Sequence, residues 1–148
     1  MRSIPELEDL VHRVRAAIRT IDAEPSHDFK KLFPGMWCEY ASIVIAEILE
    51  RDDSASWTFV DAGLPEALNG HAWLELRGNS GTRLLTIDAT LDQFSWSGDG
   101  PHVGTEQTPA ARVFTTRRYE GPWEGWGVLT FDPSYRKYAE DFAAQAGL

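Results

Sequence analysis

The sequence predicts one α+β domain, residues 1–148, in which a central helix packs on a small antiparallel β-sheet. Two helical patterns come first along the chain, and three strand-like segments follow them. Helices grouped before strands favour an α+β architecture over an alternating α/β one. A chain of 148 residues is the size of one domain with one hydrophobic core.

The helical patterns differ in how far their apolar side chains extend around the helix. In residues 5–23 apolar side chains recur at steps of three and four, which predicts an amphipathic helix with Ser3 as its N-cap. Residues 24–35 are polar and contain two prolines, so we expect a loop. Residues 37–51 are apolar around much of the circumference, which predicts a buried central helix. Residues 134–146 predict a short closing helix.

The strand-like segments occupy the middle of the chain. We expect strands at residues 57–62, 71–77 and 83–88, with a hairpin connection at residues 79–81 between the last two. Successive side chains of a strand point to opposite faces of the sheet. In the middle strand, one face carries Ala72, Leu74 and Leu76, and the other carries His71, Trp73 and Glu75.

The remaining segments carry weaker signals. Residues 95–110 are rich in Gly, Ser and Pro, which predicts a surface loop. Residues 112–116 are interpreted as a fourth strand, and residues 121–127 as a loop rich in aromatic side chains.

Charge and composition restrict the classes of partner. The formal net charge is −9 and no Lys/Arg run is present, which argues against binding to nucleic acid or to an anionic membrane. The first ten residues have no unbroken apolar stretch typical of a secretory signal, and no window reaches the length of a membrane span. Cys38 is the only cysteine, so no internal disulfide can form. These features favour a cytoplasmic protein with neutral or basic partners, and they leave the oligomeric state open.

Cys38 lies at the expected start of the central helix. A helix N-terminus carries partial positive charge and backbone N–H groups without intrahelical acceptors. Both favour the thiolate, which is the nucleophilic form of cysteine. The same N–H groups can stabilise the oxyanion that forms when sulfur attacks a carbonyl.

His71 and Asp88 supply the other two parts of a thiol mechanism. His71 begins one strand of the expected hairpin and Asp88 ends the other, so pairing of the strands places the two side chains close together. A carboxylate beside the imidazole fixes its orientation and stabilises its protonated form. Cys38, His71 and Asp88 are therefore the predicted catalytic residues.

Each of these residues also has an ordinary structural interpretation. A lone cysteine is commonly a small buried hydrophobic residue, and an Asp at a strand end is commonly a turn residue. The three side chains could also ligate a metal, but the sequence has no short-spaced Cys or His pair, so we predict no metal. The Gly/Lys/Ser pattern of a nucleotide site is missing, and we predict no cofactor. His102 is interpreted as a solvated loop residue.

Three segments together resemble the transglutaminase-like and papain-like cysteine enzymes, including small uncharacterised bacterial members. The segments are GMWCEYASIVIAEIL (residues 35–49), HAWLEL (residues 71–76) and TIDATLDQF (residues 86–94). The resemblance implies a papain/transglutaminase-like core, with a cysteine that opens a buried helix and a His and an Asp on successive antiparallel strands. It implies that Cys38 is the nucleophile, that His71 is the general base and acid, and that Asp88 orients the imidazole.

The oxyanion region departs from the pattern of these families. No Gln lies in the ten residues before Cys38, Trp37 precedes the cysteine, and Glu39 follows it. A carboxylate facing the thiol would raise its pKa. The backbone N–H of Cys38 is the first candidate for the oxyanion donor, and the side chains of Gln93 and Trp37 are others. Trp73 is a further candidate for contact with substrate.

The resemblance implies acyl transfer through a thiol. We predict an amide hydrolase, a peptidase or a protein deamidase, that acts on a peptide or protein substrate and needs no cofactor. Two alternatives remain open at this point: a transglutaminase or acyltransferase that uses an amine acceptor, and a non-catalytic binding module that retains the fold. Substrate identity is not fixed by one sequence.

Overall fold

The computed structural model describes residues 1–20, 37–52, 55–67, 70–98, 100–127, 133–145 and 147. The predicted loop at residues 24–35 lies outside them. The elements in chain order are α1 (Ile4–Thr20), α3 (Cys38–Asp52), β1 (Trp57–Gly63), β2 (Gly70–Arg77), β3 (Arg83–Asp88), the 3-10 turn η1 (Leu91–Gln93), β4 (His102–Gly104), α4 (Ala110–Val113), β5 (Thr116–Gly121), the 3-10 turn η2 (Trp123–Gly125) and α6 (Pro133–Gln145).

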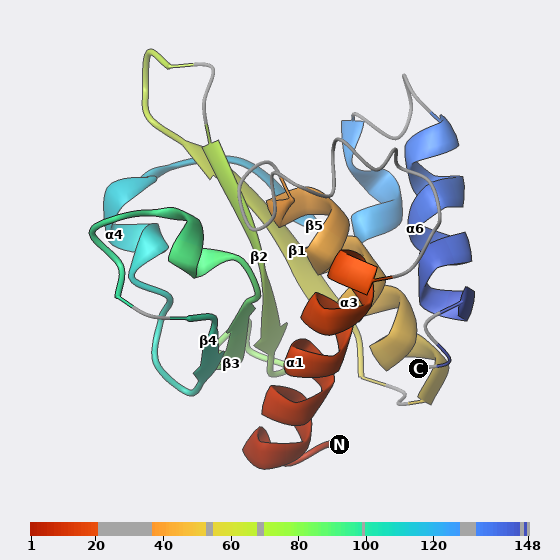
Figure 1. The fold of residues 1–148 in the computed structure, drawn as a ribbon. Helices are drawn as coiled ribbons and strands as arrows, with labels where there is room; N and C mark the ends of the chain where they lie inside the picture. The colour runs from red at the N-terminus through yellow and green to blue at the C-terminus, as the bar shows by residue number, and fades with distance from the viewer. Residues whose placement is uncertain are drawn as a thin grey trace.

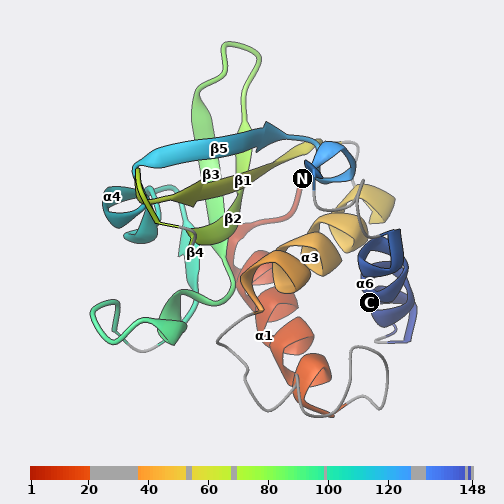
Figure 2. The ribbon, with the colours of Figure 1, turned by 90° about the horizontal axis from the view of Figure 1, so that it is seen from above.

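The strands form one five-stranded antiparallel sheet in the order β4-β3-β2-β1-β5. Helices α1, α3 and α6 lie on one side of the sheet and α4 on the other (Figure 1). The view from above shows α3 between the sheet and the other two long helices (Figure 2). This arrangement confirms the predicted α+β class. No helix among the described residues has both the length and the apolar character that a bilayer crossing requires.

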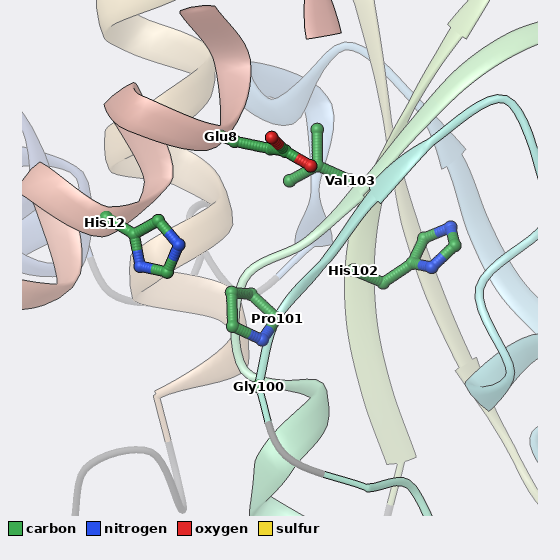
Figure 3. A pocket seen from close by; sticks show the side chains of 6 residues that line it. All are labelled: Glu8, His12, Gly100, Pro101, His102 and Val103. Atoms are coloured by element: carbon green, nitrogen blue, oxygen red, sulfur yellow. The ribbon is translucent and has the colours of Figure 1, made fainter. Parts of the chain in front are cut away.

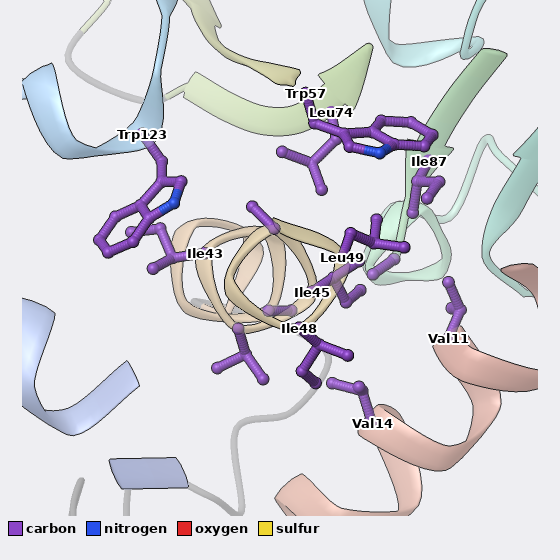
Figure 4. Close-up of a cluster of buried hydrophobic side chains, with 14 of the residues drawn as sticks. Val11, Val14, Ile43, Ile45, Ile48, Leu49, Trp57, Leu74, Ile87 and Trp123 are labelled. Carbon is purple, nitrogen blue, oxygen red and sulfur yellow. The ribbon is translucent and has the colours of Figure 1, made fainter. Parts of the chain in front are cut away.

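Helix α3 is buried around most of its circumference, as its sequence predicts. Figure 4 looks along this helix, and its side chains point outward in several directions, toward α1, the sheet and η2. Ile45 and Ile48 have no exposed surface, whereas a surface helix would keep one polar face. Burial of apolar surface stabilises the folded state by about 25 cal/mol per Å². The packing of α3 against the sheet and the neighbouring helices therefore holds its N-terminus in place.

Helix α1 covers α3 and the edge strand β4. Ser3 directly precedes the helix, at the predicted N-cap position, and its backbone N–H and hydroxyl both donate to Glu6 at 2.7 Å, so the Glu6 carboxylate reaches back to the helix start. The apolar side chains at steps of three and four are buried: Leu7, Leu10, Val11, Val14 and Ile18. Arg15 is buried on the same seam, which the apolar pattern did not predict.

The segment after β3 differs from its prediction. The predicted surface loop at residues 95–110 contains strand β4, and its last part carries the fully buried Thr108. The predicted strand at residues 112–116 is wrong, because α4 ends at Val113 and β5 begins only at Thr116. A three-residue strand and a single helical turn are too short to produce a periodic pattern.

The two faces of β2 pack against different layers. Ala72, Leu74 and Leu76 belong to the main core under α3, as the alternation predicts. Trp73 faces the other side of the sheet, where a smaller apolar cluster forms from Val60, Ala62, Leu91, Ala110 and Phe114. Both faces of β2 are therefore covered, and the strand is rigidly held between two layers.

Candidate functional site

The structure brings His71 and Asp88 together. The β2–β3 ladder begins at Leu74 and Ile87, so the first residues of β2 lie beside the end of β3. There, Nε2 of His71 is 2.8 Å from Oδ1 of Asp88. The two residues are 1% and 0% exposed, so the pair is closed to solvent. The hairpin geometry expected from the sequence is confirmed.

Asp88 is held by two further contacts. Its second oxygen, Oδ2, accepts a hydrogen bond from the buried hydroxyl of Thr108 at 2.7 Å, and its backbone pairs with His102 in β4. An ionised carboxylate can only accept, so the imidazole proton lies on Nε2 and the lone pair on Nδ1. The geometry therefore leaves Nδ1 as the basic nitrogen of His71.

We expect Thr108→Val to lower the free energy of unfolding by about 1–3 kcal/mol, because it leaves Oδ2 of Asp88 buried without a donor. Thr86→Val is the matched control: Thr86 is also fully buried, but its hydroxyl has no partner among the described residues. That substitution should be neutral or stabilising. Urea denaturation of both variants tests the difference, and equal losses would contradict the assigned role of Thr108.

Gln93 contacts the other side of the imidazole. Its amide nitrogen is 3.2 Å from Nδ1 of His71, and it also donates to the carbonyl oxygen of Thr90 at 3.1 Å. The second contact identifies the amide atom as the nitrogen, because a carbonyl oxygen only accepts. Of the sequence-predicted candidates for substrate contact, Gln93 is within hydrogen-bonding distance of the imidazole, whereas the ring of Trp73 packs near it with centroids 6.1 Å apart.

Cys38 is the first residue of α3, and its sulfur lies beside the start of β2. The backbone N–H of Ala72, the residue after His71, donates to the thiol. This N–H is available because the β3 ladder begins two residues later, at Leu74. Among the described residues the thiol makes no hydrogen bond to His71; it donates to Oε2 of Glu39 at 2.9 Å.

The environment of the sulfur favours the thiol over the thiolate. Burial, the charge of Glu39 and its hydrogen bond, and the charge of Asp88 together raise the pKa of Cys38 well above its ordinary value, against a lowering by the Ala72 N–H. These effects oppose the thiolate that the helix N-terminus is expected to favour. The side chain is 5% exposed.

The two tryptophan candidates occupy packing positions. Trp37 is fully buried, and its ring lies 5.4 Å from that of Tyr40 and 6.3 Å from that of Phe142. Trp73 is also fully buried and donates its indole N–H to Glu75 at 3.1 Å. The backbone N–H groups of the first turn of α3, that of Cys38 included, have no acceptor within the helix.

Arg15 supports the site and was missed in the sequence. Its guanidinium makes two hydrogen bonds to the carboxylate of Asp92, at 2.8 and 2.6 Å, and a third to the carbonyl oxygen of Ala89 at 2.6 Å. These contacts fasten the segment between Asp88 and Gln93 to α1. The sequence signal that could have indicated this role is a charged residue among the apolar side chains of the buried helix face.

Two cavities lie away from this cluster. One, of about 280 Å³, is lined by Glu8 and His12 of α1 and by Pro101, His102 and Val103 around β4 (Figure 3). His102 is half-buried and contacts the carbonyl oxygen of Glu106 at 2.9 Å; it begins strand β4, so its prediction as a loop residue is corrected. Within the described ranges no group of three or more His, Cys, Asp or Glu could hold a metal ion.

The second cavity, of about 410 Å³, is bordered by Glu50 of α3 and Glu124 of η2. Burial and the charge of Glu124 raise the pKa of Glu50 to about 7 from its ordinary 4.5, although Trp123 donates to its carboxylate at 3.2 Å. The folded protein therefore holds a proton that the unfolded chain releases. The stabilising contribution is complete below the unfolded pKa of 4.5 and is lost as the pH rises through about 7.

We expect Glu50→Gln to remove this loss of stability between about pH 5 and pH 8. The measurement is the free energy of unfolding in urea at several pH values. Glu8→Gln, at an exposed position on α1, is the control and should keep the wild-type pH dependence. A Glu50→Gln profile that follows the wild-type profile would show that another group titrates.

Comparisons of the chain with protein-family models, with curated proteins and with solved structures found no match.

Proposed function

We propose that the protein is a thiol-dependent acyl-transfer enzyme, and specifically an amide hydrolase that acts on a peptide or protein. The observation that carries the proposal is the buried His71–Asp88 pair, in which Asp88 also accepts a hydrogen bond from Thr108. The sulfur of Cys38 lies next to this pair, because it accepts a hydrogen bond from the backbone N–H of Ala72, the residue after His71. Burial of ionisable side chains costs free energy, whereas burial of apolar side chains in the same place does not. This cost favours a functional reason for the buried His71–Asp88 pair.

The proposed reaction begins with transfer of the thiol proton to Nδ1 of His71, while Nε2–H remains on Asp88. The sulfur then attacks the amide carbonyl carbon, and the first-turn N–H of Cys38 and the amide of Gln93 donate to the oxyanion. Collapse breaks the C–N bond, and the amine leaves with the proton from Nδ1. Water next attacks the thioester and gives a proton to Nδ1; collapse then breaks the C–S bond, and the sulfur takes that proton back from Nδ1, which releases the acid and restores the thiol.

A second candidate is a non-catalytic binding module. The buried, protonated thiol of Cys38 favours this binding module, because a thiol that donates a hydrogen bond to a carboxylate is a weak nucleophile. An amine in place of water at the second step would instead make a transglutaminase. The net charge of −9 favours neutral or basic peptides in any of these cases.

Hydrolysis of p-nitrophenyl acetate tests the proposal without a known substrate. Cys38→Ser and His71→Ala are each expected to lower the enzyme-dependent rate by about 10²–10⁴-fold, the typical contribution of acid–base catalysis. His12→Ala, an exposed histidine on α1, is the control and should leave the rate unchanged. Equal rates in all four proteins would support the binding module.

A further inference from the structure

We propose that Glu39 is a latch on the nucleophile: its carboxylate holds Cys38 as a covered thiol and must leave the sulfur before Cys38 reacts. The inference rests on the proposed function and names the regulation of the same site. It is carried by the hydrogen bond from Sγ of Cys38 to Oε2 of Glu39, at 2.9 Å, and by the near-complete burial of the sulfur.

The placement of Glu39 suits a reversible contact. Glu39 is the second residue of α3 and is half-buried, whereas Cys38 is buried, so the carboxylate bridges the thiol and the solvent. The side chain can reach water by rotation about its own bonds, without moving the helix. A glutamate turned to solvent regains its hydration, which offsets the hydrogen bond that it gives up.

Asp88 acts on the sulfur in the same sense as Glu39, since its charge also raises the pKa of Cys38. Asp61 of β1 lies opposite Ala72 in the sheet ladder, and its carboxylate accepts from the indole of Trp126 at 3.3 Å. Burial raises the pKa of Asp61, and the charge of Glu39 raises it further, against the Trp126 hydrogen bond and the charges of Arg118 and His71. The charge of Glu39 thus acts on Asp61 as well as on the thiol.

Among the charged side chains that the structure describes, Glu39 is the one that hydrogen-bonds to the sulfur, so it is the group whose removal should free the thiol. With the carboxylate turned away, negative charge leaves the immediate neighbourhood of Sγ, and the proton on sulfur can pass to Nδ1 of His71. The N–H of Ala72 remains in place to stabilise the thiolate. The latch therefore separates a resting thiol from an active thiolate by a single side-chain rotation.

The test is the pH dependence of Cys38 alkylation by iodoacetamide. In Glu39→Gln the midpoint should move to lower pH, and the rate near pH 7 should rise about threefold for each unit of the pKa shift, since a thiolate of lower pKa is also less nucleophilic. Glu47→Gln, on the same helix, is the matched control and should follow the wild type. An unchanged or higher midpoint in Glu39→Gln would overturn the latch.

Combining Glu39→Gln with His71→Ala separates the latch from the proposed function. If both hold, the gain from Glu39→Gln disappears in the double variant. A gain that survives the loss of His71 keeps the latch but contradicts the proposed proton acceptor. A loss caused by His71→Ala without any gain from Glu39→Gln keeps the acceptor and overturns the latch. Thermal melting of each variant verifies that it is folded.

Discussion

Asp88→Ala is expected to lower the free energy of unfolding by about 2–6 kcal/mol, because two buried donors lose their acceptor at about 1–3 kcal/mol each. The donors are the Nε2–H of His71, at 2.8 Å, and the hydroxyl of Thr108, at 2.7 Å. Urea denaturation measures the loss. Activity in the folded fraction should fall as well, since the imidazole loses the group that fixes its orientation.

Asp88→Asn distinguishes the structural part of this effect from the chemical part. An asparagine oxygen still accepts from Nε2–H of His71, and its amide can donate to the hydroxyl oxygen of Thr108. Stability should therefore remain within about 1 kcal/mol of the wild type. The rate should fall, because the neutral amide no longer stabilises the imidazolium. A loss of stability in Asp88→Asn as large as that in Asp88→Ala would contradict this assignment of contacts.

Arg15→Leu is expected to lower the free energy of unfolding by about 3–5 kcal/mol, because it leaves the carboxylate of Asp92 half-buried without its partner. Arg13→Leu is the control two residues earlier: its pair with Asp9 is exposed and 3.9 Å long. That variant should change stability by less than about 0.5 kcal/mol. Chemical denaturation at neutral pH gives both values.

The double variant Arg15→Leu/Asp92→Leu tests the reason for the loss. Replacing both members of a buried ion pair with apolar side chains removes the uncompensated charge. The double variant should therefore recover part of the stability lost in Arg15→Leu. If it is instead less stable than the single variant, the cost lies in packing and not in the unpaired Asp92.

The sequence predicted the parts of the site that depend on local patterns. An apolar circumference located α3, and Cys38 is its first residue, one position from the expected start. Alternation and a hairpin connection located β2 and β3, and strand pairing then placed His71 beside Asp88. Helical and strand periodicities are determined by a few neighbouring residues, so a single sequence contains them.

The contacts that hold the site could not be predicted in this way. Thr108 is 20 residues from Asp88 in sequence, and Arg15 is 77 from Asp92, so only the fold brings each pair together. The state of Cys38 depends on competing magnitudes. A helix N-terminus stabilises an anion by about 0.3–1 kcal/mol, whereas burial of a charged group costs about several kcal/mol. The negative charge of Glu39 disfavours the thiolate further.

The acyl-enzyme is the species that tests the central claim most directly. The protein would be mixed with p-nitrophenyl acetate, quenched in acid and digested, and the peptides analysed by mass spectrometry. We predict one acetyl group on the peptide that contains Cys38, transient in the wild type and greatly reduced in His71→Ala. Acetylation spread over lysines, with Cys38 unmodified in the wild type and in Glu39→Gln alike, would contradict the claim that this cysteine is a nucleophile served by His71.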